Sequence, residues 1–439
     1  MKMQKHWKRL MTGAAAAGIS AAVLPCSVSA YELELHSQEE IRAFYAAHPF
    51  PVKDEKKPEY AQEQLLSAPY TPGVLGGESL QEALNAVNTA RYIAGLPADI
   101  TIRGDYSELA QAAALIDWYR SELDHELGPD DKPADFSDEL FALCKTGTKY
   151  CNLHYGYYTL PAAIYEKDLC DSDMGRGVKN MQTAGHRRWL LNPKMQYIGF
   201  GQITGSGRRD LYSAVYALDH SREEAFTGDY IAWPPQNMPY ELYSLERKYQ
   251  SNRYPFSVSL NQQYAEPSAE TVQVDLYSHQ LDRSWHFDRN DCLTDDSSMT
   301  AQEKQEAYSH YFNVNISNRS SIRNCIIFCP DVFFAPGDTV DVRISGIQTA
   351  AGEDTEITYS VSFFSLEETQ VQPAQVLRGD ADCNGEVNVL DAVLLSRVEA
   401  EDLTCGITDE GRLNSDCDGD GRVTFSDLTW LLKKLAATS

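Results

Sequence analysis

Two stretches near the end of the chain carry oxygen-bearing side chains at matching spacing. One runs from Asp380 to Asp391 and the other from Asp416 to Asp427. Both place oxygen side chains at positions 1, 3, 5, 9 and 12 and a glycine at position 6. Ca²⁺ takes six to eight oxygen ligands, and loops of this pattern supply them. The repeat therefore predicts two calcium sites, with the glycine expected where the chain turns sharply and a Cβ would clash.

The expected ligands are the residues at positions 1, 3, 5, 7, 9 and 12 of each loop. In the first loop they are Asp380, Asp382, Asn384, Glu386, Asn388 and Asp391. In the second loop they are Asp416, Asp418, Asp420, Arg422, Thr424 and Asp427. Aspartate replaces the usual glutamate at position 12, so its reach to the metal is shorter.

A short amphipathic helix is expected after each loop, at residues 391–398 and 427–435, because apolar residues recur at helical spacing. No helix is expected before either loop. This duplicated arrangement over residues 377–439 resembles a type I dockerin, the module by which secreted proteins dock onto cohesin modules of a cellulosome scaffoldin. The resemblance implies a small all-α domain that binds two Ca²⁺ ions.

In dockerins, loop positions 10 and 11 are a main source of partner selectivity. The residues at these positions are Val389, Leu390, Phe425 and Ser426. They differ from the commonest Ser-Thr pair, so the identity of the cohesin stays open. The two pairs also differ from each other, which argues against two interchangeable binding orientations.

Residues 1–30 have the features of a secretory signal peptide: a basic start, an apolar stretch at 11–24 and small residues at 28–30. Pro25 disfavours lipid attachment at the following Cys26. No other segment reaches the roughly 18 continuous apolar residues that a transmembrane helix needs. We therefore expect a secreted, extracellular protein without a transmembrane segment.

Composition narrows the partners and the architecture. The formal net charge of −26 would repel nucleic acid and anionic membranes. A length of 439 residues predicts two or three domains. Removing Cys26 from the ten cysteines leaves nine, so at least one thiol stays unpaired in a monomer, and the pairing of the others stays open.

The expected order is an extended lead-in over 31–78, a folded domain over 79–222, a second domain over 225–370, a linker at 371–376 and the dockerin at 377–439. In the lead-in, Ser37 and Glu40 are expected to form a capping box, as are Ser79 and Glu82 at the next helix. Within 79–222, helices are expected at 79–92, 108–123 and 181–191, followed by strands at 197–201 and 211–217. Helices first and strands last indicate a layered α+β fold.

Residues 225–370 show period-two apolar runs separated by turn residues. The runs are 256–260, 272–276, 325–329, 340–344 and 357–363. They predict an all-β, immunoglobulin-like sandwich. Trp233 and Trp285 suggest carbohydrate binding if they are exposed, but their place among predicted strands favours packing in the core.

Several motifs in 79–222 resemble a CAP domain, the superfamily of cysteine-rich secretory proteins, antigen 5 and pathogenesis-related 1 proteins. They are Asn88, Arg91, His125, Asn152, Leu153 and the stretches 184–193 and 198–201. The resemblance implies an α-β-α sandwich with a cleft holding two histidines and two acids. His125 and His186 match the histidines. One family glutamate is missing at Cys151, and Asp171 or Asp173 could replace the other acid.

Such a cleft has several uses. His125 and His186 could pack across it without metal, bind a ligand or partner, or hold Zn²⁺ that activates water for hydrolysis. Cys151 could act as a nucleophile if a basic neighbour lowered its pKa. His154 and His220 match no family role and are expected on the surface or in the core.

These features together favour a non-enzymatic interpretation. In it, the dockerin brings a CAP ligand- or partner-binding domain to an extracellular, polysaccharide-degrading complex. The alternative is a metal- or thiol-dependent hydrolase of peptide or polysaccharide. A dockerin indicates where a protein sits rather than what it catalyses.

Overall fold

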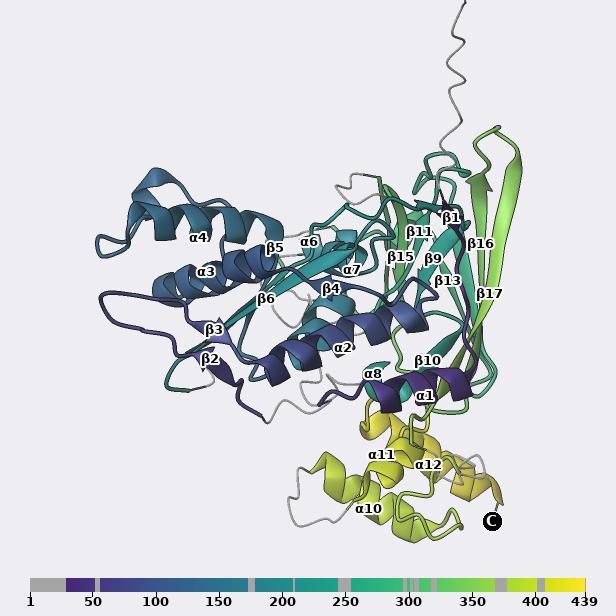
Figure 1. The fold of residues 1–439 in the computed structure, drawn as a ribbon. Coiled ribbons are helices and arrows are strands. Elements are labelled where there is room, and N and C mark those ends of the chain that lie inside the picture. The colour runs from purple at the N-terminus through teal and green to yellow at the C-terminus, as the bar shows by residue number, and fades with distance from the viewer. Residues whose placement is uncertain are drawn as a thin grey trace, which may run out of the picture.

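The computed structural model describes residues 29–51, 56–172, 178–207, 210–243, 254–294, 298–300, 303, 308–316, 322–367, 377–400 and 407–438. The expected signal peptide up to residue 28, Asp173, Cys405 and the expected linker lie outside the described residues. Figure 1 shows an α/β region, a β-sandwich beside it and a small helical region below both. No helix among the described residues is long and apolar enough to cross a membrane.

The α/β region contains a four-stranded sheet. Its strands lie in the order β4-β6-β7-β5, with β4 parallel to β6 and the other pairs antiparallel. The elements are α2 (Gly77–Ile93), β4 (Thr101–Ile102), α3 (Gly104–Arg120), η1 (Pro129–Asp131), α4 (Asp138–Tyr150), β5 (Cys151–Tyr155), α5 (Leu160–Ala163), the π-helix η2 (Ile164–Leu169), α6 (Lys179–Thr183), α7 (Gly185–Leu190), β6 (Tyr197–Thr204) and β7 (Leu211–Tyr216).

Helices cover both faces of this sheet (Figure 1). Ile198 and Phe200 of β6 pack in the core that contains α2, whereas Ile203 packs in the core that contains α3 and α4. A Cβ on Gly199 or Gly201 would lie 2.2 Å from backbone carbon of α3. Only glycine permits this close packing of α3 on β6. The layering agrees with the expected α-β-α order, although layered folds serve many unrelated families.

Two helix predictions were wrong in detail. α2 begins after Gly76, so Ser79 lies inside the helix, where its Oγ accepts a hydrogen bond from the Glu59 N–H. The helix expected at 181–191 is instead split into α6 and α7 at Ala184, whose φ is +45°. The capping box of Ser37 and Glu40 is confirmed in α1 (Gln38–Ala47).

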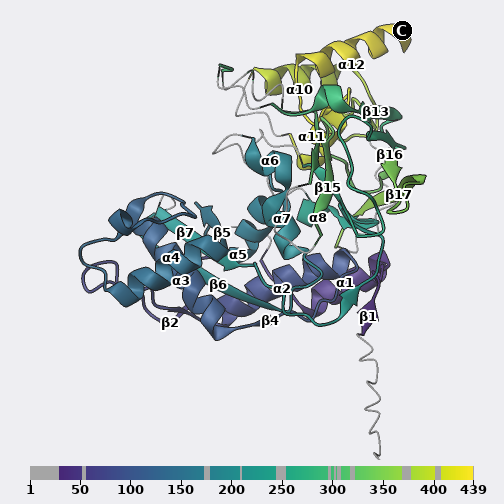
Figure 2. The same cartoon turned by 90° about the horizontal axis from the view of Figure 1, so that it is seen from above.

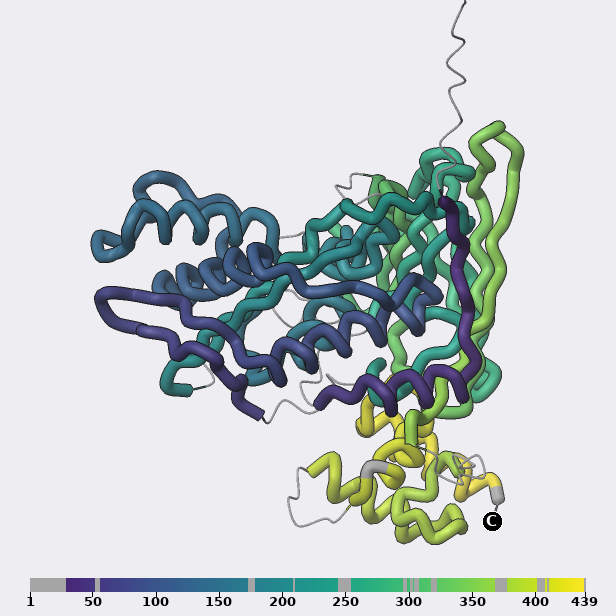
Figure 3. The backbone as a smooth tube through the Cα atoms, in the orientation of Figure 1, coloured from purple at the N-terminus to yellow at the C-terminus, as the bar shows by residue number. Residues whose placement is uncertain are grey.

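The lead-in packs along the rest of the molecule, as the smooth trace in Figure 3 shows. Its strand β1 (Ala30–Tyr31) pairs with β8 (Ala225–Phe226), and β2 (Tyr60–Gln62) pairs with β3 (Val74–Leu75). Ile41 and Phe50 of this segment are buried in the main core. The lead-in is therefore held by the folded regions that follow it in the chain.

The β-sandwich consists of two sheets that share a core. One has the order β14-β15-β11-β9, from β9 (Tyr230–Trp233), β11 (Phe256–Leu260), β14 (Tyr311–Asn315) and β15 (Asn324–Cys329). The other has the order β10-β17-β16-β12-β13, from β10 (Asn237–Pro239), β12 (Gln273–Ser278), β13 (Arg283–Phe287), β16 (Thr339–Gln348) and β17 (Asp354–Phe364). Two short helices, α8 (Tyr240–Tyr243) and η5 (Arg289–Asp291), accompany them. Trp233 and Trp285 are 0% and 5% exposed, so packing in the core is confirmed for both.

The α/β region and the sandwich share one hydrophobic core. It joins residues such as Leu169 and Phe200 with Trp233 and Phe328. In Figure 2, α6 and α7 lie between the α/β sheet and β15. The regions expected at 79–222 and 225–370 therefore form one continuous packed body.

The C-terminal region contains α10 (Val389–Glu399), α11 (Asp409–Ser415) and α12 (Phe425–Thr438) around a small core that includes Leu395 and Leu431. α10 and α12 begin two residues earlier than expected. α11 precedes the second loop, so the expectation of no preceding helix was wrong there. Its N-cap is Thr408, whose side chain accepts from the Gly411 N–H.

No disulfide joins any of the eight described cysteines. They are Cys144, Cys151, Cys170, Cys292, Cys325, Cys329, Cys383 and Cys417.

Candidate functional site

Each acidic loop gathers three carboxylates. Asp380, Asp382 and Asp391 each place one carboxylate oxygen within 4.8 Å of the others, and a second trio does so in the second loop. The second trio is Asp416, Asp418 and Asp420. Like charges repel at such distances, so each cluster has the composition that a divalent cation would stabilise.

The glycine at position 6 lets each loop fold back on its first aspartate. The N–H of Gly385 donates to Asp380 Oδ2 at 2.9 Å, and that of Gly421 to Asp416 Oδ2 at 2.8 Å. Both glycines have positive φ, +87° and +78°. A Cβ on Gly385 would meet no atom within 4 Å. The glycine there is required by its backbone conformation and not, as expected, to avoid a clash.

The aspartate at position 12 ties the two ends of each loop together. Asp391 accepts from the N–H groups of Asp382 and Asn388, at 3.2 and 2.8 Å. Asp427 accepts from the N–H groups of Cys417, Asp418 and Thr424 in the corresponding way. Asp391 and Asp427 are fully buried. The shorter side chain is thus held in place by loop backbone.

Positions 5, 7 and 9 have distinct roles. The Asn384 amide donates to Asp382 Oδ2, which ties position 5 to the cluster. Asn388 and Thr424 accept from N–H groups at the start of the following helices, so they act as helix caps. At position 7, the Arg422 side chain is a cation and cannot ligate calcium, and loops of this kind use the backbone carbonyl there. The Glu386 side chain at the same position of the first loop is exposed.

Electrostatics also favour a cation in the second loop. Burial and, to a smaller extent, the carboxylates of Asp427, Asp420 and Asp418 raise the pKa of Asp416 to about 7, although the hydrogen bond from the Gly421 N–H lowers it. Burial likewise raises the pKa of Asp418. Asp416 Oδ1 is buried and accepts no hydrogen bond within the described part of the chain. A buried carboxylate oxygen of this kind fits direct bonding to a metal.

Apolar side chains lie exposed on the helices next to the loops. We call them the α10–α12 patch: Val389, Leu390, Val393, Phe425 and Leu432. Phe425 is 69% exposed and Val389 is 64% exposed. Ser426 is also exposed. The sequence analysis missed the exposed positions of Val393 and Leu432. Both helices carry more apolar residues than one buried face can take, and this excess was the signal for them. Exposed patches of large apolar residues often mark interaction sites.

The two histidines expected in a cleft are anchored in different ways. His186, near the start of α7, has Nδ1 2.9 Å from Asp171 Oδ1. Asp171 is buried, and its other oxygen accepts from the Arg187 N–H. His125 lies after α3 and donates from Nδ1 to the Thr148 carbonyl at 2.7 Å. Asp171 is therefore the acid that stands beside His186.

Among the described residues, groups of three or more His, Cys, Asp or Glu side chains that could bind a metal ion occur only in the two C-terminal loops. No such group includes His125 or His186 within those residues. A zinc site in the α/β region is therefore not supported.

A buried chain of polar groups surrounds His154 on β5. His154 Nε2 lies 2.8 Å from Asp168 Oδ1, and the Ser213 hydroxyl lies 3.4 Å from His154 Nδ1. All three residues are at most 2% exposed. The residue types are those of a hydrolase triad, but burial denies a substrate access to Ser213. His154 is a core histidine.

Burial shifts the pKa of two remaining candidates, Cys151 and His220. Burial raises the pKa of the Cys151 thiol well above its usual value, and Asp117 adds to this effect. A nucleophilic cysteine needs the opposite shift. Burial lowers the pKa of His220, which packs edge-on against Trp189 and contacts Asn192.

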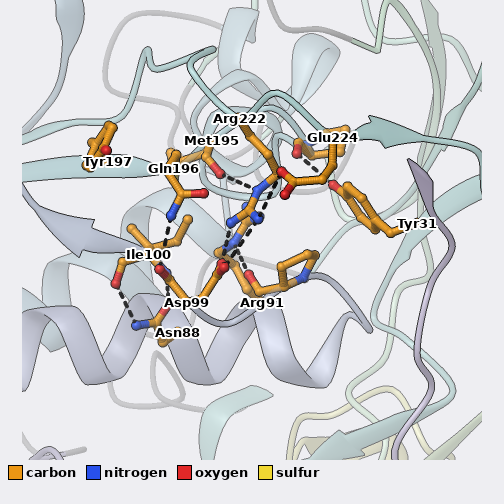
Figure 4. Close-up of polar contacts among 12 residues, drawn as sticks. Tyr31, Asn88, Arg91, Asp99, Ile100, Met195, Gln196, Tyr197, Arg222 and Glu224 are labelled. Carbon is orange, nitrogen blue, oxygen red and sulfur yellow. Dashed lines mark hydrogen bonds and ion pairs between the residues drawn. The ribbon is translucent and has the colours of Figure 1, made fainter. Parts of the chain in front are cut away.

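Several motif residues in the α/β region stabilise the fold. Arg91 is fully buried and donates to the carbonyls of Pro97, Leu190 and Asn192. Figure 4 shows Asn88, which exchanges hydrogen bonds with the Ile100 backbone. In the same view, Arg222 bonds Asp99 and the Met195 carbonyl.

Arg187 and Arg188 extend this stabilisation into the sandwich. Arg187 donates to Ser257 Oγ at 2.9 Å, and Arg188 donates to Asn315 Oδ1 at 2.8 Å. The two arginines that follow His186 thus hold the two regions together.

Residues 378–436 match the family described as dockerin type I domain. The chain thus carries a type I dockerin domain at its C-terminal end. Domains of this family bind Ca²⁺ and dock onto cohesin, and the acidic clusters of both loops lie within the match. No curated protein and no solved structure matches the chain.

Proposed function

We propose that the chain docks in a Ca²⁺-dependent manner onto a cohesin module of a scaffoldin and holds its folded body within an extracellular, polysaccharide-degrading complex. The observation that carries this proposal is the pair of three-carboxylate loops beside the exposed α10–α12 patch. Bound cations would fix the loops from which α10 and α12 start. The exposed patch on these helices would then form a contact surface that depends on calcium.

In the first loop, the proposed ligands are Asp380, Asp382, Asn384, Asp391 and the Glu386 carbonyl, with Asn388 acting through water at position 9. In the second loop, they are Asp416, Asp418, Asp420, Asp427 and the Arg422 carbonyl, with Thr424 at position 9. Ca²⁺ would neutralise the clustered carboxylates. The proposed partner contacts are Val389, Leu390, Phe425 and Ser426.

Titration calorimetry of the full chain with CaCl₂ tests the ion sites, and surface plasmon resonance over immobilised type I cohesin modules tests docking. We expect two ions per chain and binding that excess EGTA abolishes. Binding that persists unchanged in chelator would contradict the proposal.

For residues 79–222, the proposal is a CAP domain that binds a ligand or partner without catalysis. It is supported by the helix-sheet-helix layering, by Asp171 beside His186, and by Asn152, whose amide lies 3.4 Å from the His186 carbonyl. The His186 side chain is 22% exposed, so a ligand can reach it. The buried Cys151 gives no support to a thiol hydrolase.

Zinc analysis of the calcium-loaded full chain discriminates between binding and hydrolysis in this region. We expect no stoichiometric zinc, and the same result in His125→Ala and His186→Ala. One zinc per chain that either substitution removes would favour the hydrolase instead.

The proposed boundaries are a signal peptide at 1–30, a lead-in at 31–78, the CAP domain at 79–222, an immunoglobulin-like sandwich at 225–370, a linker at 371–376 and the dockerin at 377–439. Secretion follows from the signal peptide, and mass spectrometry of the exported protein would find Tyr31 at its N-terminus.

A further inference from the structure

A shallow groove of about 600 Å³ lies on the sheet β10-β17-β16-β12-β13. β12, β13, β16 and β17 line it. In Figure 1, β16 and β17 form the outer edge of the body. The volume lies within the range of about 300–1,000 Å³ that ligand sites in proteins occupy.

Strand register sorts the polar side chains of the groove into two rows across the sheet. One row is formed by His286, Asp275, Arg343 and Thr358. The other is formed by Ser284, Tyr277, Asp341 and Ser360. The residues between them on three of the strands, Leu276, Trp285 and Val342, are buried in the core, and Tyr359 of β17 is half-buried against it. The sheet therefore presents eight hydrogen-bonding side chains on one surface.

The charged groups of the groove are paired with each other or with groups at its rim. His286 Nδ1 lies 2.7 Å from Asp275 Oδ1, and Arg343 bonds Glu356 at 2.8 Å. Asp341 accepts from Ser360 at 2.6 Å and lies 2.8 Å from His279 Nε2. These pairs fix the orientation of the side chains.

The pairing selects the class of ligand. An anion would meet the carboxylates of Asp275 and Asp341, and a cation would meet the Arg343 guanidinium. A neutral polyol avoids both conflicts, because each hydroxyl donates to a carboxylate and accepts from an N–H or O–H group. The ring of Tyr277 adds an aromatic surface of the kind on which the C–H face of a sugar packs. Recognition through a preformed polar surface limits the entropy lost on binding.

We propose that this groove binds a neutral oligosaccharide, with its chain crossing β13, β12, β16 and β17. The site is separate from the dockerin loops and from His125 and His186, so it does not depend on the proposed docking. It also differs from sugar stacking on Trp233 or Trp285, because both are buried.

Titration calorimetry of the full chain in CaCl₂, without cohesin, tests this inference. The probes are cellohexaose, xylohexaose and mannohexaose, with hexagalacturonate as the anionic counterpart. We expect saturable binding of at least one neutral probe. Arg343→Gln and Tyr277→Ala should each weaken it about tenfold or more, as expected for loss of a charged hydrogen bond or a stacked ring.

Arg289→Gln is the matched control, because Arg289 is similarly exposed on the sandwich and pairs with Glu270 outside the groove. Its affinity should equal that of the unaltered chain, and circular dichroism should show the same fold for all variants. Absence of binding by every neutral probe would overturn the proposal. So would equal affinity in Arg343→Gln and Arg289→Gln, or tighter binding of hexagalacturonate.

Discussion

The acidic loops and the buried polar groups of the α/β region use carboxylates in opposite ways. In the loops, carboxylates approach one another, as Asp416, Asp418 and Asp420 do within 4.8 Å. In the α/β region, two buried carboxylates each face an imidazole: Asp168 faces His154, and Asp171 faces His186. One arrangement brings like charges together, whereas the other pairs each carboxylate with a ring nitrogen of the same chain.

This difference separates a site from a structural element. The clustered carboxylates accept mostly from backbone N–H groups, and their mutual repulsion lowers stability unless a cation is bound. An imidazole–carboxylate pair gains its hydrogen bond when the protein folds and needs no ligand. Residue types alone do not distinguish these cases, because Ser213, His154 and Asp168 would suggest catalysis if they were exposed.

The largest expected effect is that of Asp380→Ala combined with Asp416→Ala. Removing position 1 from both loops should abolish calcium uptake and lower cohesin affinity by at least about 1,000-fold, which corresponds to about 4 kcal/mol. Calorimetry and surface plasmon resonance measure the two effects. Glu399→Ala with Glu410→Ala is the control, because it removes two exposed acids of the same domain outside the loops. Unchanged cohesin affinity in the loop variant would show that docking does not depend on calcium binding by the loops.

Substitution in the buried pair of Asp168 and His154 should change the stability of the fold. Asp168→Ala leaves His154 buried without its carboxylate partner, which should lower the free energy of unfolding by about 3–5 kcal/mol. Thermal unfolding of the calcium-loaded chain measures the change in the main transition. Asp168→Asn keeps an acceptor and should cost less, and neither variant should change calcium uptake. Equal melting temperatures for the wild-type and Asp168→Ala chains would contradict the structural role.

Sequence predicted the loops well because their chemistry is local. Ligand spacing, the glycine at position 6 and the helix after each loop all lie within about twenty residues, so no long-range contact needs to be known. What it missed there was α11, a seven-residue helix with little apolar periodicity. The clash expected at Gly385 was wrong because only coordinates show that open space surrounds it.

The α/β region was less predictable because its polar contacts span long distances in the chain. Ser213 reaches His154 across 59 residues, and Arg187 reaches Ser257 across 70. Period-two patterns identified β11 and β15 but not β14, whose polar residues interrupt the apolar run. Sequence could not show that the two regions share a core, because amphipathic patterns do not identify the partner of an apolar face.

The α10–α12 patch allows ion binding to be separated from partner contact. Phe425→Ala should weaken cohesin binding about tenfold or more, as for an exposed aromatic that becomes buried in an interface. Calcium uptake should stay at two ions, because the Phe425 side chain provides no ligand. Leu35→Ala serves as the control, since Leu35 is also an exposed large apolar residue but lies in the lead-in. An equal loss in both variants would argue against the patch.

The smallest expected effect concerns Cys151. Burial raises the pKa of this thiol well above its usual value of 9, so at pH 8 far less than a tenth of it is thiolate. Iodoacetamide should therefore leave Cys151 of the folded chain unmodified, while the partly exposed Cys292 reacts slowly. Mass spectrometry of the digested protein measures both sites. Burial also raises the pKa of Cys292, so increasing the pH to 9 should accelerate its labelling, whereas Cys151 should stay unmodified because its side chain is buried. Labelling of Cys151 as fast as Cys292 at pH 8 would show that the buried thiol is accessible and would restore the thiol-hydrolase hypothesis.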